Sequence, residues 1–166
     1  MSGAGERAAT ATVAVRVAVA PPVAFAAFTE QIDQWWRRGP KFWHAGMRDG
    51  TIALEGRRGG RVYERWHEDG AECEFELGRV LRWEPPHRLA FSYRNVTFAP
   101  VERTEVEVEF AAQGSGTLVT VRHRGWEALR QDHPARHGMA DDALARSVGL
   151  WWGDQMTSLR EFAAPR

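Results

Sequence analysis

Histidines are the first candidates for chemistry in this chain, because they transfer protons and bind metals near neutral pH. Of its six histidines, His133 and His137 stand four apart, the spacing of two metal ligands on one helix. Pro134 interrupts any helix between them, and no H-E-x-x-H pattern occurs, so we predict no metal site. His123 shares a strand face close to Trp126; we expect a hydrogen-bonded pocket histidine, with a general acid–base role as the alternative.

Acids and nucleophiles give weaker signals than the histidines. Glu72, Glu74 and Glu76 recur at every second residue, which is typical of the solvated face of a strand. Glu64 can instead turn inward, where an acid paired with an arginine would hold a polar ligand group. Cys73 is the only cysteine and no G-x-S-x-G motif occurs. We therefore assign no catalytic residue and no cofactor.

Aromatic side chains are unusually abundant and point to a pocket. Eight tryptophans occur in 166 residues, four of them in the adjacent pairs 35–36 and 151–152. Trp is large and apolar but keeps one N–H donor, so it suits pocket walls as well as packed interiors. Helical neighbours lie about 100° apart, so we expect one member of each pair at a pocket rim. The predicted ligand-binding residues are Trp36, Trp66, Phe75, Phe91, Tyr93, His123, Trp126, Trp151, Trp152 and Met156.

Composition excludes several classes of protein. Lys plus Arg and Asp plus Glu both number 22, so the chain lacks the basic surplus that a nucleic-acid partner requires. The Ala- and Val-rich stretch 10–28 is interrupted by Arg16 and broken by Pro21, so we expect neither a membrane span nor a signal peptide. With one cysteine, we expect a cytoplasmic protein. We predict a disordered segment over 1–9 and a single domain over 10–166.

The first elements that must position these residues are a strand and two short helices. Apolar residues alternate through Val13, Val15, Val17 and Val19, which predicts a strand with one buried face. The prolines at 21 and 22 end this strand and suit the first turn of a helix that continues to Phe28. We expect the carboxylate at position 33 to cap a second short helix carrying the first tryptophan pair, followed by a loop over 39–50.

Six further strands and a long helix complete the predicted order. Short turns join the strands, which implies an antiparallel meander, and their charged outer faces imply that only one face is covered. The strands are expected at 51–55, 61–67, 73–83, 88–94, 104–110 and 117–124. The final helix is expected over 139–163, with Leu150 pointing away from an apolar stripe. That stripe comprises Leu144, Val148, Trp151, Trp152, Gln155, Leu159 and Phe162. A twisted sheet is concave, so a helix laid across it leaves a cavity.

Six segments carry a family resemblance that covers about residues 10 to 163. They are P-P-V-A-F-A-A-F-T at 21–29, D-Q-W-W at 33–36, G-G-R-V-Y-E at 59–64, G-R-V-L-R-W-E-P-P-H-R-L-A-F-S-Y at 78–93, L-V-T-V-R-H at 118–123, and the stretch from G-L-W-W at 149 to Phe162. The turn at 83–86 is the most specific part. Together they resemble the domain related to activators of the heat-shock protein 90 ATPase.

This resemblance implies an α+β fold of the helix-grip superfamily. The fold would be a curved seven-stranded antiparallel sheet wrapped around a long C-terminal helix, with two short helices after the first strand and a hydrophobic pocket inside. We expect the bend at 125–138 to form a lid. Our first hypothesis is intracellular binding of a hydrophobic or aromatic small molecule. A polyketide-type cyclase or aromatase is the first alternative. A chaperone ATPase-regulating module ranks last, because chaperone activators carry an additional N-terminal domain.

Overall fold

The computed structural model describes residues 10–42 and 50–165. The segment predicted to be disordered and most of the loop predicted over 39–50 lie outside these ranges. In chain order the elements are β1 (Ala11–Val17), α2 (Pro21–Thr29), α3 (Ile32–Trp35), β2 (Thr51–Leu54), β3 (Arg61–Glu68), β4 (Ala71–Glu84), β5 (Arg88–Tyr93), β6 (Thr104–Gln113), β7 (Gly116–Arg124), two 3₁₀ turns, η1 (Trp126–Ala128) and η2 (Pro134–Arg136), and α4 (Asp141–Phe162).

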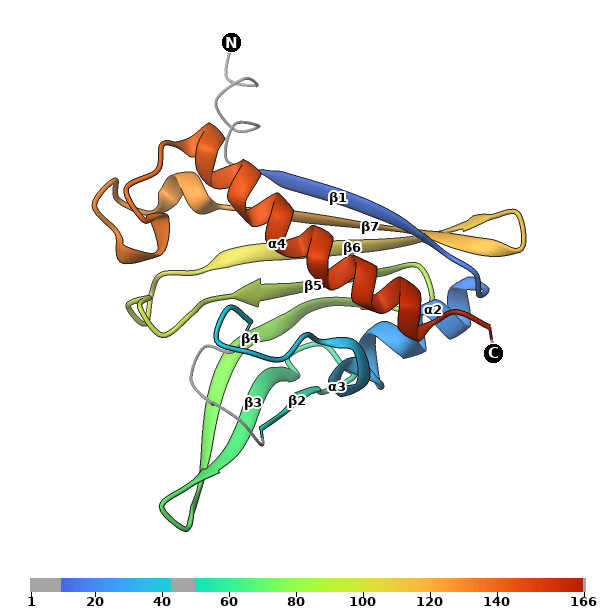
Figure 1. Cartoon of the computed structure of the whole chain (residues 1–166), viewed down its shortest axis with the longest axis horizontal. Coiled ribbons are helices and arrows are strands. Elements are labelled where there is room, and N and C mark those ends of the chain that lie inside the picture. Colours follow the sequence, from blue (N-terminus) through green and yellow to red (C-terminus); the bar gives the residue numbers. More distant parts are fainter. Residues whose placement is uncertain (1–9, 43–49, 166) are drawn as a thin grey trace.

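All seven strands form one antiparallel sheet in the order β1-β7-β6-β5-β4-β3-β2. Strands β2 to β7 follow one another as the predicted meander, and β1 closes the far edge by pairing with β7. The sheet is curved, and α4 runs diagonally across its concave side (Figure 1). The predicted α+β architecture is therefore confirmed.

Alternation in β6 shows why one face of the sheet is buried. Val106, Val108 and Phe110 are at most 3% exposed and point toward α2 and α4. The intervening acids face outward, where they pair with arginines of the neighbouring strands. Exposed ion pairs of this kind contribute little free energy, so burial of the apolar row is what fixes the orientation of the strand.

Strand β4 changes partner partway along its length. Its first half pairs with β3 and its last residues, from Val80 on, pair with β5, with register irregularities on both sides. Gly78 lies at this bend, and a Cβ there would meet the Ser92 carbonyl oxygen at 1.6 Å. The bend turns the β3–β4 hairpin away from the rest of the sheet (Figure 1).

The two short helices form where they were predicted, with one difference. Pro21 opens α2 as expected, but the residue that precedes α3 is Gln31, and no side chain caps that helix. The expectation that Asp33 caps α3 is therefore wrong. The Asp33 carboxylate instead accepts the Ile52 N–H at 3.0 Å and pairs with Arg38 at 2.9 Å, which ties α3 to β2.

Helix α4 buries the predicted stripe against β1, α3 and the sheet interior. Trp152, Gln155 and Leu159 are fully buried, whereas Leu150 is 74% exposed, as expected. Both Trp35 and Trp36 are buried, at 2% and 3% exposed. The reason is that α3 is covered by α4 on the sheet's concave side, and the Trp35 indole donates to the Ala27 carbonyl.

Glycine substitutions test the tight approach at the β4 bend. We expect Gly78→Ala to lower the free energy of unfolding by several kcal/mol, because its Cβ cannot coexist with the β5 backbone. Gly149→Ala in α4 is the matched control: nothing lies within 4 Å of its Cβ, so helix propensity should stabilise the protein by about 0.5–1 kcal/mol. Chemical denaturation measures the free energy of unfolding of both variants. Equal effects of the two substitutions would contradict the assigned bend.

Candidate functional site

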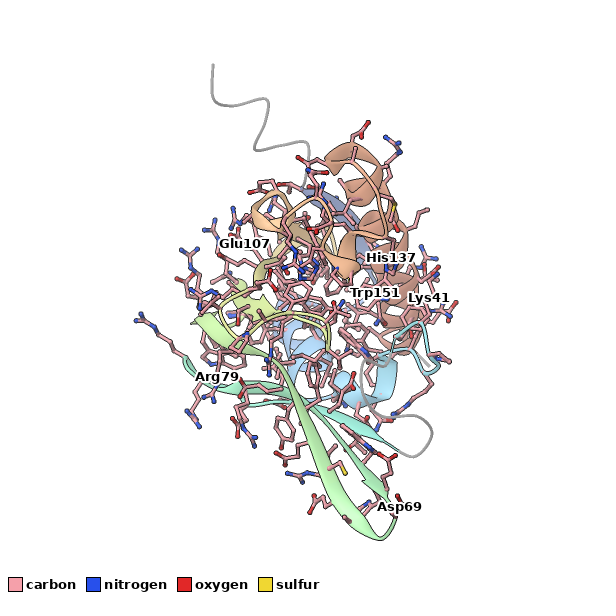
Figure 2. All side chains as sticks on the ribbon, turned by 90° about the vertical axis from the view of Figure 1, so that its left-hand side faces the viewer. Lys41, Asp69, Arg79, Glu107, His137 and Trp151 are labelled. Atoms are coloured by element: carbon pink, nitrogen blue, oxygen red, sulfur yellow. The ribbon has the colours of Figure 1, made fainter. Side chains whose placement is uncertain are left out.

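A cavity of about 440 Å³ opens between α4 and one end of the sheet. This volume is within the range of small-molecule sites. Its walls come from the end of β5, from β7, from the first half of α4, from the segment after β7 and from the turn after α3. The lining residues are Pro40, Lys41, Tyr93, Asn95, His123, Trp126, Ala135, His137, Met139, Leu144, Ser147, Val148 and Trp151. Figure 2 shows Lys41, Trp151 and His137 close together at this end of the molecule.

A chain of hydrogen bonds fixes the floor of the cavity. The Trp152 indole N–H donates to His123 Nδ1 at 3.0 Å. Because an indole N–H can only donate, Nδ1 is the acceptor and the imidazole proton lies on Nε2. That N–H donates to Thr104 Oγ1 at 2.7 Å, and the Thr104 hydroxyl donates to the Tyr93 carbonyl at 3.0 Å. The chain joins α4 to β7, β6 and β5.

Burial sets the charge state of the ring at the centre of this chain. His123 is 1% exposed, and burial lowers the pKa of His123 to about 3. Burial likewise raises the pKa of the Tyr93 phenol, and the charge of Glu64 raises it further. His123 is therefore a neutral ring with both nitrogens occupied. It joins α4 to the sheet through these two hydrogen bonds.

Indole rings form two of the walls. Trp151 packs edge-on against Trp36, with centroids 5.5 Å apart, and its Nε1 donates to the Lys41 carbonyl at 2.9 Å. Trp126 packs against His123 at 4.8 Å, but its buried Nε1 has no partner among the described residues. The cavity therefore has two rigid aromatic walls, and one of them keeps an unused donor.

The segment between β7 and α4 forms the outer wall, at the place where a lid was predicted. It begins at Gly125 and ends near Gly138, both in the left-handed region with φ of 97° and 75°. The fully buried Arg136 holds it together by donating to the Trp126 carbonyl at 3.1 Å and the Met139 carbonyl at 3.2 Å, and by pairing with Asp141.

A second link anchors this outer wall to the loop between β5 and β6. His133 Nδ1 accepts the Ala135 N–H, so its Nε2 carries the proton and donates to Glu102 at 3.0 Å. The Ala99 N–H and His133 together hold the pKa of Glu102 below its usual range. His133 therefore has a structural partner at each nitrogen. His137 lies apart from it on the cavity wall.

The predicted ligand-binding residues fall into three groups. Four line the cavity: Tyr93, His123, Trp126 and Trp151. Four lie in the packed core outside the lining: Trp36, Phe91, Trp152 and Met156. Two lie on the β3–β4 hairpin: Trp66, which donates to Glu68, and Phe75, which packs under Arg94. Strand alternation identified the inner face correctly, but the bend in β4 carries the last two away from the cavity. Their roles as ligand contacts stay predictions.

Sequence reasoning missed several wall residues because they lie outside regular strands. Lys41 and Asn95 come from turns, and His137 and Met139 from the segment before α4. Such positions show no periodicity. Lys41 is nevertheless the only lysine in the chain, beside 21 arginines, and that count was a usable signal.

A curved antiparallel sheet gripping a C-terminal helix, with a cavity between them, defines a helix-grip protein. The chain belongs to the family described as activator of Hsp90 ATPase homolog 1-like protein, whose model matches residues 18–146. No curated protein matches the chain in sequence. No helix among the described residues is long and apolar enough to cross a membrane.

Solved structures share the fold at low sequence identity. Protein NE0264 from Nitrosomonas europaea superposes with a TM-score of 0.61 and 19% identity, covering 93% of this chain and 94% of its own. CalU16 from Micromonospora echinospora superposes with a TM-score of 0.56 and 21% identity, and the match covers 94% of this chain and 76% of CalU16. The Aha1 dimer from Colwellia psychrerythraea superposes with a TM-score of 0.60 and 13% identity, and the match covers 93% of this chain and 95% of that one. These likenesses establish the architecture alone.

The neutral state of His123 makes stability depend on pH. The unfolded chain binds a proton below about pH 6.5, whereas the folded ring does not until about pH 3, so stability present above pH 6.5 is lost as pH falls. We expect the free energy of unfolding to fall by about 1.4 kcal/mol per pH unit between pH 6 and 5. His123→Gln should flatten this slope, and His87→Gln, on an exposed turn, should not. Urea titrations at each pH measure the free energy of unfolding. If its slope with pH is unchanged in His123→Gln, the assignment of a neutral buried His123 is contradicted.

Removing the buried guanidinium tests how the outer wall is held. Arg136→Met leaves the Asp141 carboxylate and two buried carbonyls without their donor. We expect a loss of about 3 kcal/mol or local unfolding of residues 126–139, seen as faster amide hydrogen exchange there. Arg130→Met, an exposed arginine of the same segment, is the control. Unchanged exchange in Arg136→Met would show that the wall is held by other contacts.

Proposed function

We propose that this protein binds a small molecule with an aromatic or otherwise apolar body in the cavity between α4 and the sheet. The observation that carries the proposal is a cavity of about 440 Å³ walled by Trp126, Trp151 and Tyr93 beside aliphatic side chains of α4. Pockets of this size with mainly apolar walls and a few polar groups are typical ligand sites.

Apolar burial supplies enough free energy for useful affinity. A ligand that buries about 300 Å² of apolar surface gains about 7.5 kcal/mol at 25 cal/mol per Å². Edge-to-face contacts with the two indoles add about 1 kcal/mol each, and the losses of association offset part of this sum. Dissociation constants in the micromolar range are therefore expected.

The hydrogen bonds of His123 argue against this residue as the acid–base group of a cyclase. A cyclase of this fold needs a titratable group that meets the substrate, and His123 was the sequence-based candidate for that role. Both of its nitrogens are engaged by Trp152 and Thr104, and its ring stays neutral. The chaperone alternative rests on the family description, and the large apolar side chains exposed among the described residues are Val23, Val96, Val101 and Leu150.

A neutral fluorescent probe, N-phenyl-1-naphthylamine, tests the proposal. We expect its emission to rise on binding, tryptophan emission to fall, and the melting temperature to increase by about 5–10 °C at 100 times Kd. Val148→Phe puts a ring into the cavity from its wall and should weaken binding at least tenfold. Leu150→Phe places the same ring in solvent two residues away and is the control.

Two results would overturn this proposal. One is an absence of probe binding to the wild-type protein at millimolar concentrations. The other is equal weakening by Val148→Phe and Leu150→Phe, which would place the probe outside the cavity.

A further inference from the structure

We propose that the ligand is an anion, an aromatic or apolar molecule carrying a carboxylate or a comparable acidic group that Lys41 receives at the cavity mouth. This rests on the proposed function and deepens it by naming the chemical class of the ligand.

Among the described residues that line the cavity there is one lysine and no acid. No Asp or Glu occurs among the thirteen lining residues, although acids make up 22 of the 166 residues of the chain. Lys41 supplies an ammonium group at the mouth, and the His137 ring lies on the same wall (Figure 2). A ligand acid would therefore meet an ammonium group on the lining, with Asp154, which pairs with Lys41, as its competitor.

Lys41 is free to change partners at low cost. Its Nζ lies 3.0 Å from Asp154 on α4, and the two side chains are 62% and 49% exposed. Exposed pairs of this kind are weak, so a carboxylate inside the mouth can compete with Asp154 for the ammonium. The backbone of the same residue is fixed, because its carbonyl accepts the Trp151 N–H. The cation is therefore held beside an aromatic wall while its head remains available.

The hydrogen-bonding groups of the walls also favour an acceptor on the ligand. Trp126 Nε1 is a buried donor without a partner among the described residues, and an indole or an ammonium can only donate. His123 offers nothing in return, because both of its nitrogens are already bonded. The Trp126 indole nitrogen is closed off from the open cavity, so the donor that a ligand acceptor meets at the mouth is the Lys41 ammonium.

Glu64 is a second acid near the cavity, and its charge acts on the Tyr93 phenol. It is fully buried on β3 and does not line the cavity, so it does not contact a ligand there. The composition of the chain also favours an anionic ligand. In a protein with 21 arginines, the single lysine stands at the cavity mouth, where a compact ammonium can follow a ligand of variable position.

A matched pair of probes tests this inference. 8-Anilino-1-naphthalenesulfonate and N-phenyl-1-naphthylamine share one aromatic body, and only the first carries an anion. We expect the wild-type protein to prefer the anion by about fivefold or more, with a preference that weakens as salt rises. Lys41→Gln should bring the ratio of the two affinities close to one. Asp154→Asn should increase it by removing the competing carboxylate, and Arg146→Gln, an exposed charge change on α4, should leave it as in the wild type.

A second readout follows Lys41 directly. Reductive ¹³C-methylation labels only this lysine and the N-terminal amine, so one side-chain resonance reports on the mouth. We expect the sulfonate probe to shift that resonance and the neutral probe to leave it in place. Equal affinities for both probes, or a preference that survives Lys41→Gln, would overturn the anion proposal and leave the proposed function standing. A failure of both probes to bind would overturn both.

Discussion

The hydrogen bond from the Trp152 indole to His123 is the interaction on which the site depends. It is fully buried, and it joins the long helix to the end of β7 at one defined point. Since the same ring bonds Thr104, and Thr104 bonds the Tyr93 carbonyl, three strands and one helix share a single polar connection. Buried polar networks that are fully satisfied specify one arrangement of a core more strictly than apolar contact alone. The position of α4 across the sheet is set in this way.

The cavity is a consequence of that position. Toward the C-terminal end of α4, Gln155, Met156 and Leu159 fill the space between helix and sheet. Toward its N-terminal end lies the cavity, and the segment after β7, held together by Arg136, forms the outer wall. Trp151 then faces this space while its neighbour is locked into the core. The interface between α4 and the sheet is therefore packed at one end and open at the other. The Trp152–His123 hydrogen bond fixes the helix, and the segment held by Arg136 bounds the open end.

Sequence patterns predicted the architecture well because burial repeats along each element. The alternating Val and Glu residues of β6, and the stripe of α4, identified the inner faces correctly. What they could not predict was the bend at Gly78, because β4 is one continuous strand in sequence and changes partner only in three dimensions. Trp66 and Phe75 lie on the inner face of the sheet, as expected, but on the β3–β4 hairpin and outside the cavity lining. Lys41 and His137 were missed because turns carry no period.

The most direct test of the account is a crystal structure of the protein grown with N-phenyl-1-naphthylamine. We predict electron density for the naphthyl ring between Trp126 and Trp151, and an unchanged hydrogen bond between Trp152 and His123. Density on another surface, or a cavity filled by inward collapse of Trp151, would contradict the central claim that the helix and the sheet enclose a ligand site.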